Sequence, residues 1–149
     1  LQEKIQCDEA VLEKTHSGRL VRVGVSINGS YFTTYAADGV IVATPTGSTA
    51  YSFSARGPII SPSHRCVLLT PVSAHMLFDR ALVLAPSETL DLEVVEEREV
   101  DLVVDGREVC ALVPGDVVRC TAASRSAKIM GLGSRDFHQL LKRKFGLPS

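Results

Sequence analysis

Alternation of apolar and polar residues is the feature that most restricts the fold of this chain. From position 21 to position 27, valine and isoleucine occupy every second place, and arginine, glycine and serine fill the places between them. Side chains of a strand point to opposite faces in turn, so this pattern predicts a strand with one buried face. Asn28-Gly29 follows at once and favours a two-residue type I′ turn. Residues 19–35 are therefore predicted to form a β-hairpin.

The same pattern returns in the second half of the chain. Alternating runs cover 90–94, 100–104 and 109–113, and Asp105-Gly106 lies between the last two as a second hairpin signal. Shorter apolar runs add further predicted strands at 40–43, 66–70, 81–84 and 117–121. Short strands separated by turn residues are typical of sandwiches and related all-β folds. The predicted fold class is therefore mainly β, in a β-sandwich-like arrangement.

The end of the chain carries the pattern of an amphipathic helix. Its predicted apolar face consists of Phe137, Leu140, Leu141 and Phe145. Ser134 is a candidate N-cap, and Gly146 followed by Pro148 is a typical helix end. We expect this C-terminal helix either to cover one end of the sandwich or to pack on a domain outside the chain.

Charge and composition exclude two classes of partner. The 149 residues include 16 basic and 17 acidic side chains, and only 5% are aromatic, so neither a basic surface nor many stacking platforms for nucleic acid are expected. No apolar run approaches the roughly 18 residues of a membrane helix. We expect one domain, no nucleic acid or membrane partner, and a cytoplasmic location.

The four cysteines show no metal-binding spacing. Cys7, Cys66, Cys110 and Cys120 form no C-x-x-C pair. We expect reduced thiols in the core, since cysteine is commonly buried, and a disulfide between Cys110 and Cys120 remains a second possibility.

The stretch from Ala37 to Tyr51 has the most unusual composition. An apolar strand leads into Thr44-Pro45-Thr46-Gly47, and hydroxyl side chains then gather at the start of a short helix predicted over 48–55. Free N–H groups at such a start can bind an anion or a polar edge of a ligand. Serine and threonine are also ordinary helix caps, so the residues alone leave ligand binding and capping open.

This stretch resembles the signature of a known family. Residues 38–51, with the core Thr-Pro-Thr-Gly-Ser-Thr-Ala-Tyr, are similar to the signature of the NAD kinase family, whose members use ATP to phosphorylate the adenosine ribose 2′-hydroxyl of NAD. The likeness continues at 57–60, within 69–78, and at 82–84 and 105–107. Residues 140–148 look like the end of actinobacterial members.

The resemblance covers almost the whole chain but only the C-terminal part of the family's sequence. It implies that residues 1–149 are the C-terminal NAD-binding and oligomerisation domain, a β-sandwich in the family. The N-terminal α/β domain, whose Gly-Gly-Asp-Gly motif supplies the proposed base, is then absent from this chain. We therefore expect no catalytic residue here and no activity from the isolated fragment.

The resemblance also implies a binding site and partners. The residues that match the family's NAD-binding positions are Asp8, Glu9, Asp38, Thr46, Thr49, Ala50, Tyr51, Ser54 and Gly106. Mg²⁺ is expected to accompany ATP, with no metal ligand in this chain. The implied partners are NAD, ATP or polyphosphate, the N-terminal domain, and further copies in a homodimer or homotetramer.

Two positions depart from the family pattern. Asp8 stands where the family has asparagine, and an ionised aspartate only accepts hydrogen bonds. Ala36 stands where the family often has arginine. These departures motivate an alternative function, a non-catalytic nucleotide-sensing or assembly module. Asp8-Glu9 could also be two solvated acids, and the Asp38-Gly39 and Asp105-Gly106 pairs could be turns alone.

Overall fold

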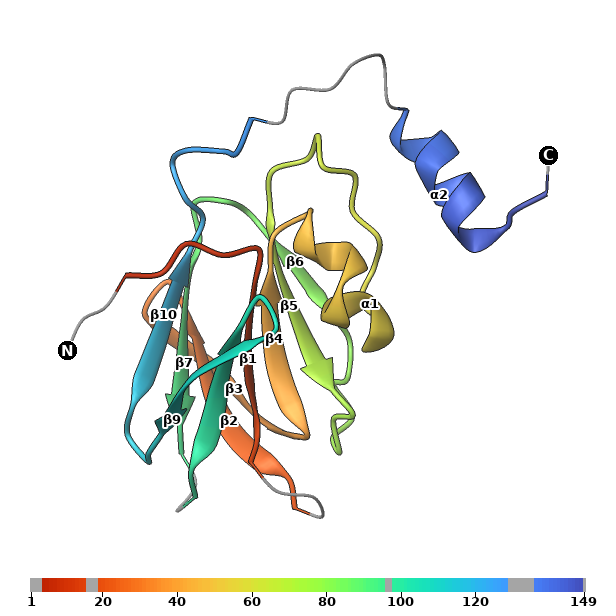
Figure 1. Cartoon of the computed structure of the whole chain (residues 1–149). Helices are drawn as coiled ribbons and strands as arrows, with labels where there is room; N and C mark the ends of the chain where they lie inside the picture. The colour runs from red at the N-terminus through yellow and green to blue at the C-terminus, as the bar shows by residue number, and fades with distance from the viewer. Residues whose placement is uncertain (1–3, 16–18, 96–97, 129–135, 149) are drawn as a thin grey trace.

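The chain folds into two facing antiparallel sheets with two helices beside them (Figure 1). The computed structural model describes residues 4–15, 19–95, 98–128 and 136–148. Because both helices lie outside a largely stranded body, the prediction of a mainly β, sandwich-like fold is confirmed.

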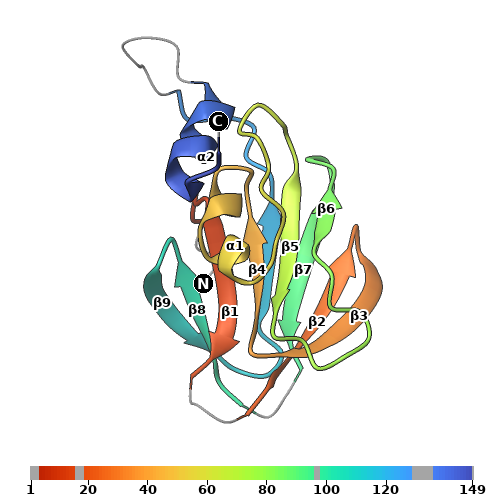
Figure 2. The same cartoon turned by 90° about the vertical axis from the view of Figure 1, so that its right-hand side faces the viewer.

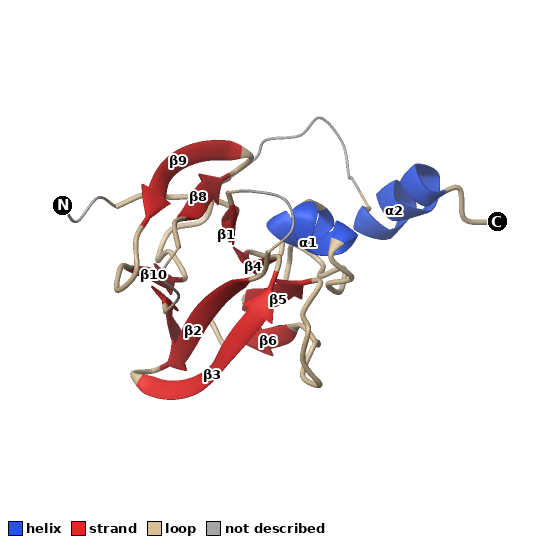
Figure 3. Cartoon of the chain, turned by 90° about the horizontal axis from the view of Figure 1, so that it is seen from below, coloured by secondary structure: helices blue, strands red, loops and turns tan. Residues whose placement is uncertain are grey.

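Each sheet runs in an order that differs from the order of the chain. The larger sheet has the order β6 (Leu82–Leu84), β5 (Val67–Val72), β4 (Gly39–Ala43), β1 (Glu9–Lys14), β8 (Val100–Val104), β9 (Arg107–Leu112). The smaller sheet has the order β10 (Val117–Thr121), β7 (Thr89–Val94), β2 (Val21–Ile27), β3 (Ser30–Ala37). Figure 3 shows the two layers from one end.

Both predicted hairpin turns are confirmed. Asn28 and Gly29 have φ angles of 53° and 78°, and Asp105 and Gly106 have φ angles of 47° and 75°. Two successive positive φ angles define the type I′ turn that suits the twist of the flanking strands. The first hairpin continues to Ala37, two residues beyond the predicted end.

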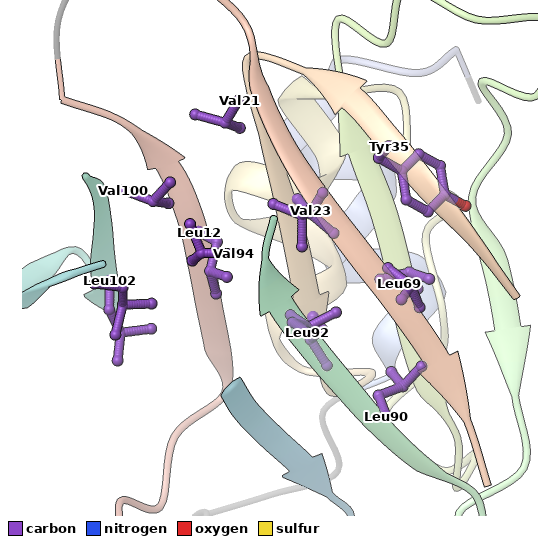
Figure 4. Close-up of a cluster of buried hydrophobic side chains, with 14 of the residues drawn as sticks. Leu12, Val21, Val23, Tyr35, Leu69, Leu90, Leu92, Val94, Val100 and Leu102 are labelled. Carbon is purple, nitrogen blue, oxygen red and sulfur yellow. The ribbon is translucent and has the colours of Figure 1, made fainter. Parts of the chain in front are cut away.

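The main core lies between the sheets, as Figure 4 shows. It is built from the inward residues of the alternating strands, such as Val23, Leu92 and Tyr35, which are fully buried. Burying a valine or leucine side chain stabilises a fold by about 1.5–3 kcal/mol. A second cluster, around Val11, Ile41 and Leu68, covers the outer face of the larger sheet.

Strand β1 was not predicted, although it lies between β4 and β8 at the centre of the larger sheet. Its residues Glu9 to Leu12 are all buried, because the main core covers one face and the second cluster covers the other. A strand buried on both faces shows a continuous apolar run rather than alternation. The interpretation of Glu9 as a solvated acid is therefore wrong, whereas Asp8 is exposed.

The cysteines are free in the structure, so the disulfide between Cys110 and Cys120 is not formed. The predicted burial of the thiols is confirmed in part, because Cys7, Cys66 and Cys120 are half-buried. Cys110 is exposed, and the expectation of a core thiol is wrong there because β9 is the edge strand of its sheet.

Helix α2 (Phe137–Phe145) lies next to α1 (Tyr51–Ser54) (Figure 2). Asp136 is its N-cap and accepts a hydrogen bond from the His138 N–H, while the predicted cap Ser134 falls outside the described residues. Gly146 ends the helix with a φ of 60°, as predicted. Among the described residues, no helix has the length and apolar character that crossing a membrane requires.

Candidate functional site

The signature segment forms a compact turn on the outer face of the larger sheet. Strand β4 ends at Ala43, a 3-10 turn η1 (Gly47–Thr49) follows, and α1 continues from it. The short helix predicted over 48–55 is thus present as two consecutive single turns. Two serines anchor them: the buried Ser48 hydroxyl donates to the Pro45 carbonyl (2.6 Å) and accepts from the Ile60 N–H (3.0 Å).

The second anchor is Ser52, whose hydroxyl pairs with that of Thr70 on β5 at 2.9 Å. Both groups are buried, so this contact holds α1 on the sheet. Most of the remaining residues of the segment face outward. The exposed residues from 44 to 54 are Thr46, Thr49, Ala50, Tyr51, Phe53 and Ser54. All of these except Phe53 belong to the set that the sequence predicted to bind NAD, and they are open to a ligand.

Close packing explains two glycines of this region. A Cβ on Gly47 would lie 2.2 Å from the Asp8 carbonyl oxygen, and one on Gly57 would lie 2.3 Å from the Ser52 hydroxyl. Real Cβ atoms do not approach backbone so closely, so only glycine allows the turn to lie against the start of β1. The signature is thereby brought next to Asp8 and Glu9.

Asp8 is joined to the signature by two hydrogen bonds, and a third continues from Thr44 into the turn. Its carbonyl accepts from the Thr44 N–H (2.9 Å), its carboxylate Oδ1 accepts from the Thr44 hydroxyl (2.8 Å), and that hydroxyl in turn accepts from the Gly47 N–H (3.2 Å). The Asp8 residue is exposed to solvent. The structure therefore places Asp8 at the start of the signature turn.

Glu9 is 7% exposed and points beneath α1. Its Oε2 accepts from the Ser52 N–H at 3.2 Å, so the carboxylate caps the first turn of that helix. Burial raises the pKa of Glu9, while hydrogen bonds from the Ser52 and Tyr51 backbone N–H groups oppose the rise. Glu9 thus belongs to the same cluster as the signature, on its inner side.

Asp38 lies at the other end of β4 from Thr44. Its Oδ1 is 2.6 Å from the Lys14 Nζ, an ion pair that the sequence did not predict because the two residues lie 24 positions apart. Tyr51 is affected by acids at both ends of this region. Burial is the largest cause of its raised pKa, and the negative charges of Glu13, Asp38 and Glu9 raise it further. The phenol therefore lies within electrostatic reach of two carboxylates of β1, Glu9 and Glu13, and of Asp38 before β4.

The turn at Gly106 completes the cluster. Gly106 is exposed, and its neighbour Asp105 accepts hydrogen bonds from the backbone N–H groups of Asp8 and Glu9 at 3.0 and 2.9 Å. The sequence identified this pair as a hairpin, but the role of the Asp105 carboxylate could only be seen from contacts 96 and 97 residues apart in the chain.

The described ranges contain no group of three His, Cys, Asp or Glu side chains that could hold a metal ion. A hollow of about 810 Å³ lies elsewhere, lined by the 58–66 loop, residues 83–86 and α2. It shares no residue with the predicted NAD-binding set.

The chain was compared with known proteins. Residues 7–132 match the family model of the ATP-NAD kinase C-terminal domain. The chain is 43% identical to NAD kinase 1 of Streptomyces avermitilis over 94% of this chain and 40% of that protein, and 38% identical to the NAD kinase of Syntrophotalea carbinolica over 93% and 49%. It therefore spans less than half the length of these relatives.

Solved structures show the same likeness. The yeast NADH kinase complexed with NADH superposes with a TM-score of 0.85 at 30% identity, over 95% of this chain and 44% of that one. An Archaeoglobus fulgidus NAD kinase in complex with ATP, at 23% identity and a TM-score of 0.68, shows the shared fold over 78% and 45%. The resemblance inferred from residues 38–51 is confirmed, and the chain belongs to the ATP-NAD kinase family, in which it matches the C-terminal domain.

Proposed function

We propose that this chain is the NAD-binding domain of an NAD kinase, which transfers the γ-phosphate of ATP to the adenosine ribose 2′-hydroxyl of NAD. The observation that carries the proposal is the division of the signature into anchored and open residues. Ser48 and Ser52 are buried and hold the segment on the sheet, whereas Thr49 and Tyr51 are exposed on its outer side. A purely structural turn has no need of that outward row of hydroxyls.

The outward residues suit the parts of a dinucleotide. The Tyr51 ring offers an apolar face for a base, and the hydroxyls of Thr46, Thr49 and Ser54 can hydrogen-bond the polar edges of a base or ribose. The backbone at Ala50 and Gly106 lets the ligand approach closely, since neither side chain extends beyond a methyl group. Such contacts bind and orient the acceptor.

Three carboxylates add specificity to this surface. Asp8 accepts hydrogen bonds only, so it can accept from the amino group of adenine but, unlike asparagine, cannot donate to a ring nitrogen. Glu9 fixes the start of α1, and with it Tyr51, in addition to any contact with a ribose hydroxyl. Asp38, paired with Lys14, presents both a negative and a positive group for the amide end of NAD.

Phosphoryl transfer relies on positioning and charge stabilisation more than on covalent chemistry of the protein. A domain that holds the acceptor can therefore be required without supplying the base. In this proposal the N-terminal domain supplies the base and receives ATP with its Mg²⁺. Homodimers or homotetramers, and a cytoplasmic location, are part of the same proposal.

The test uses the full protein, in which, by this proposal, an N-terminal domain precedes this chain. NADP formation is measured with NAD and with ATP varied in turn. Tyr51→Ala and Thr49→Ala are each expected to raise KM for NAD about tenfold, the effect of losing about 1.4 kcal/mol of binding. Tyr31→Ala and Thr121→Ala are matched controls, because both residues are exposed on the smaller sheet.

Two results would contradict the proposal. An unchanged KM for NAD in both site variants would show that the signature does not bind NAD. NADP formation by the 149-residue chain alone would show that this chain contains the base. The alternative is a nucleotide-sensing or assembly module without activity, favoured by Asp8 and Ala36. A full protein that binds NAD in calorimetry but forms no NADP would support that alternative.

A further inference from the structure

The turn between β8 and β9 makes more contacts than a hairpin requires. The Asp105 Oδ1 accepts from the N–H groups of both Asp8 (3.0 Å) and Glu9 (2.9 Å), and the Asp105 N–H donates to the Glu9 carbonyl (3.0 Å). The ladder between β1 and β8 ends at the pair Ala10 and Val104. These three bonds therefore extend the attachment of β1 beyond the ladder, into the segment that leads to the site.

The aspartate at this place does more than form the turn. Its φ of 47° is one that aspartate tolerates better than most side chains, and Asp-Gly is itself a favoured pair for a type I′ turn. Glycine at both turn positions would form the same hairpin without the negative charge, which is among the causes that raise the pKa of the nearby Glu9. The carboxylate adds two charge-assisted bonds from backbone N–H groups, which the turn itself does not require.

The segment fixed by Asp105 carries the contacts of the proposed site. The Asp8 carbonyl oxygen accepts from the Thr44 N–H and lies 2.2 Å from the position that a Cβ on Gly47 would occupy. The Glu9 carboxylate accepts from the Ser52 N–H at the start of α1. A shift of the Asp8 and Glu9 backbone would thus move both ends of the signature turn.

We propose that Asp105 is a positioning residue of the NAD site: its carboxylate fixes the Asp8-Glu9 backbone and, through it, the Thr44 to Tyr51 segment. This inference rests on the proposed function, since it assigns Asp105 to that same site. Asp105 itself contacts no substrate in this arrangement. It acts through two backbone N–H groups, so its removal changes the affinity for NAD rather than for ATP.

The substitutions are chosen to separate positioning from folding. Asp105→Gly removes the carboxylate and relieves the positive φ, so the hairpin keeps its turn. Asp105→Asn keeps an oxygen acceptor without the charge and is tolerated at this φ, as Asn28 shows at the equivalent turn. Asn28→Gly is the matched control, because the Asn28 Oδ1 likewise accepts from a backbone N–H, that of Thr89 at 3.0 Å, in the smaller sheet.

In the full protein, Asp105→Gly is expected to raise KM for NAD about tenfold, with KM for ATP and the melting temperature close to those of Asn28→Gly. Asp105→Asn is expected to recover most of that loss. Hydrogen exchange should show faster exchange of the Asp8 and Glu9 amides, and of residues 44–52, in Asp105→Gly alone.

Two outcomes overturn the proposal: a KM for NAD in Asp105→Gly equal to that of the control, or equal rises in both KM values with a larger loss of melting temperature. A wild-type protein that forms no NADP contradicts the proposed function instead. In that case hydrogen exchange still decides whether Asp105 fixes the segment, and unchanged exchange at 44–52 refutes it.

Discussion

Tyr35 is the side chain whose burial is least balanced by its contacts. It is fully buried between the sheets, and within the described ranges its hydroxyl is the one buried side-chain polar atom without a hydrogen-bond partner (Figure 4). Leaving a buried polar group unpaired costs about 1–3 kcal/mol. Burial also raises the pKa of Tyr35 to about 12. The ring stabilises the core, while the hydroxyl opposes that stabilisation.

Removing this hydroxyl should therefore stabilise the protein. Tyr35→Phe is expected to raise the free energy of unfolding by about 1 kcal/mol at pH 7, measured by urea denaturation. Tyr31→Phe is the control, because Tyr31 is exposed on the same strand and its hydroxyl lies 3.0 Å from that of Thr34. A lower stability of Tyr35→Phe would show that the hydroxyl has a partner.

The stability advantage of Tyr35→Phe over the wild type should be larger in alkaline solution. Unfolded tyrosine ionises near pH 10, whereas Tyr35 in the folded state ionises near pH 12. The unfolded state thus releases its proton first, and the folded state loses stability as the pH rises from 10 towards 12. The difference between Tyr35→Phe and wild type should be larger at pH 10.5 than at pH 7.

Among the elements, strands with one exposed face were predicted from alternation, and β4 and β5, which are covered on both faces, were predicted from their apolar runs, whereas β1 was not predicted. Strands β2 and β7 alternate because one side meets the core and the other meets water. Strand β1 has the second core cluster on its outer side, so its sequence shows no alternation and its buried Glu9 resembles a surface acid. Its place between β4 and β8 depends on contacts with residues far along the chain.

Only some residues of the candidate site could be predicted from the sequence. The signature residues and Asp8-Glu9 were found by resemblance, and the structure places them side by side. Which serine or threonine faces inward could not be predicted, because Ser48 and Thr49 are chemically alike and differ only in what covers them. Lys14 and Asp105 were missed because their partners lie 24 and about 96 residues away.

The docking of the η1 turn on β1 predicts the effect of a single methyl group. In Gly47→Ala the new Cβ would lie 2.2 Å from the Asp8 carbonyl oxygen, which is backbone and cannot rotate away. Overpacking of this kind costs about 1–3 kcal/mol. We expect a loss of about 2 kcal/mol in the free energy of unfolding and a higher KM for NAD.

Gly24→Ala provides the comparison for this variant. The nearest atom to a Cβ on Gly24 is a methyl carbon of Val95, at 3.1 Å, in an exposed side chain that can turn away. Its cost should stay below about 1 kcal/mol. Equal losses in the two variants would mean that the turn at Gly47 is not held tightly against Asp8.

On the scale of the whole molecule, the sandwich and α2 differ in how many of their side chains are buried. The sheets bury a continuous core, whereas no residue of α2 is buried. The helix meets the body where the Phe145 ring lies 5.2 Å from that of Phe53 on α1, and at the hollow lined by Phe137 and Leu141. An aromatic pair contributes about 0.5–1.5 kcal/mol beyond its buried area.

The sandwich should therefore fold without its C-terminal helix. A chain that ends at Lys128 is expected to lose less than about 2 kcal/mol in urea denaturation, followed by far-ultraviolet circular dichroism. Leu12→Ala sets the scale for a true core residue, since Leu12 is fully buried and its truncation should cost about 2–5 kcal/mol. The truncation also removes the contact between Phe145 and Phe53, and Phe53 lies on the same helix as Tyr51. The full protein shortened at Lys128 should therefore bind NAD less tightly. A loss as large as that of Leu12→Ala would instead make α2 part of the folding core, and the exposed face of Leu140 and Phe145 would then need a different explanation.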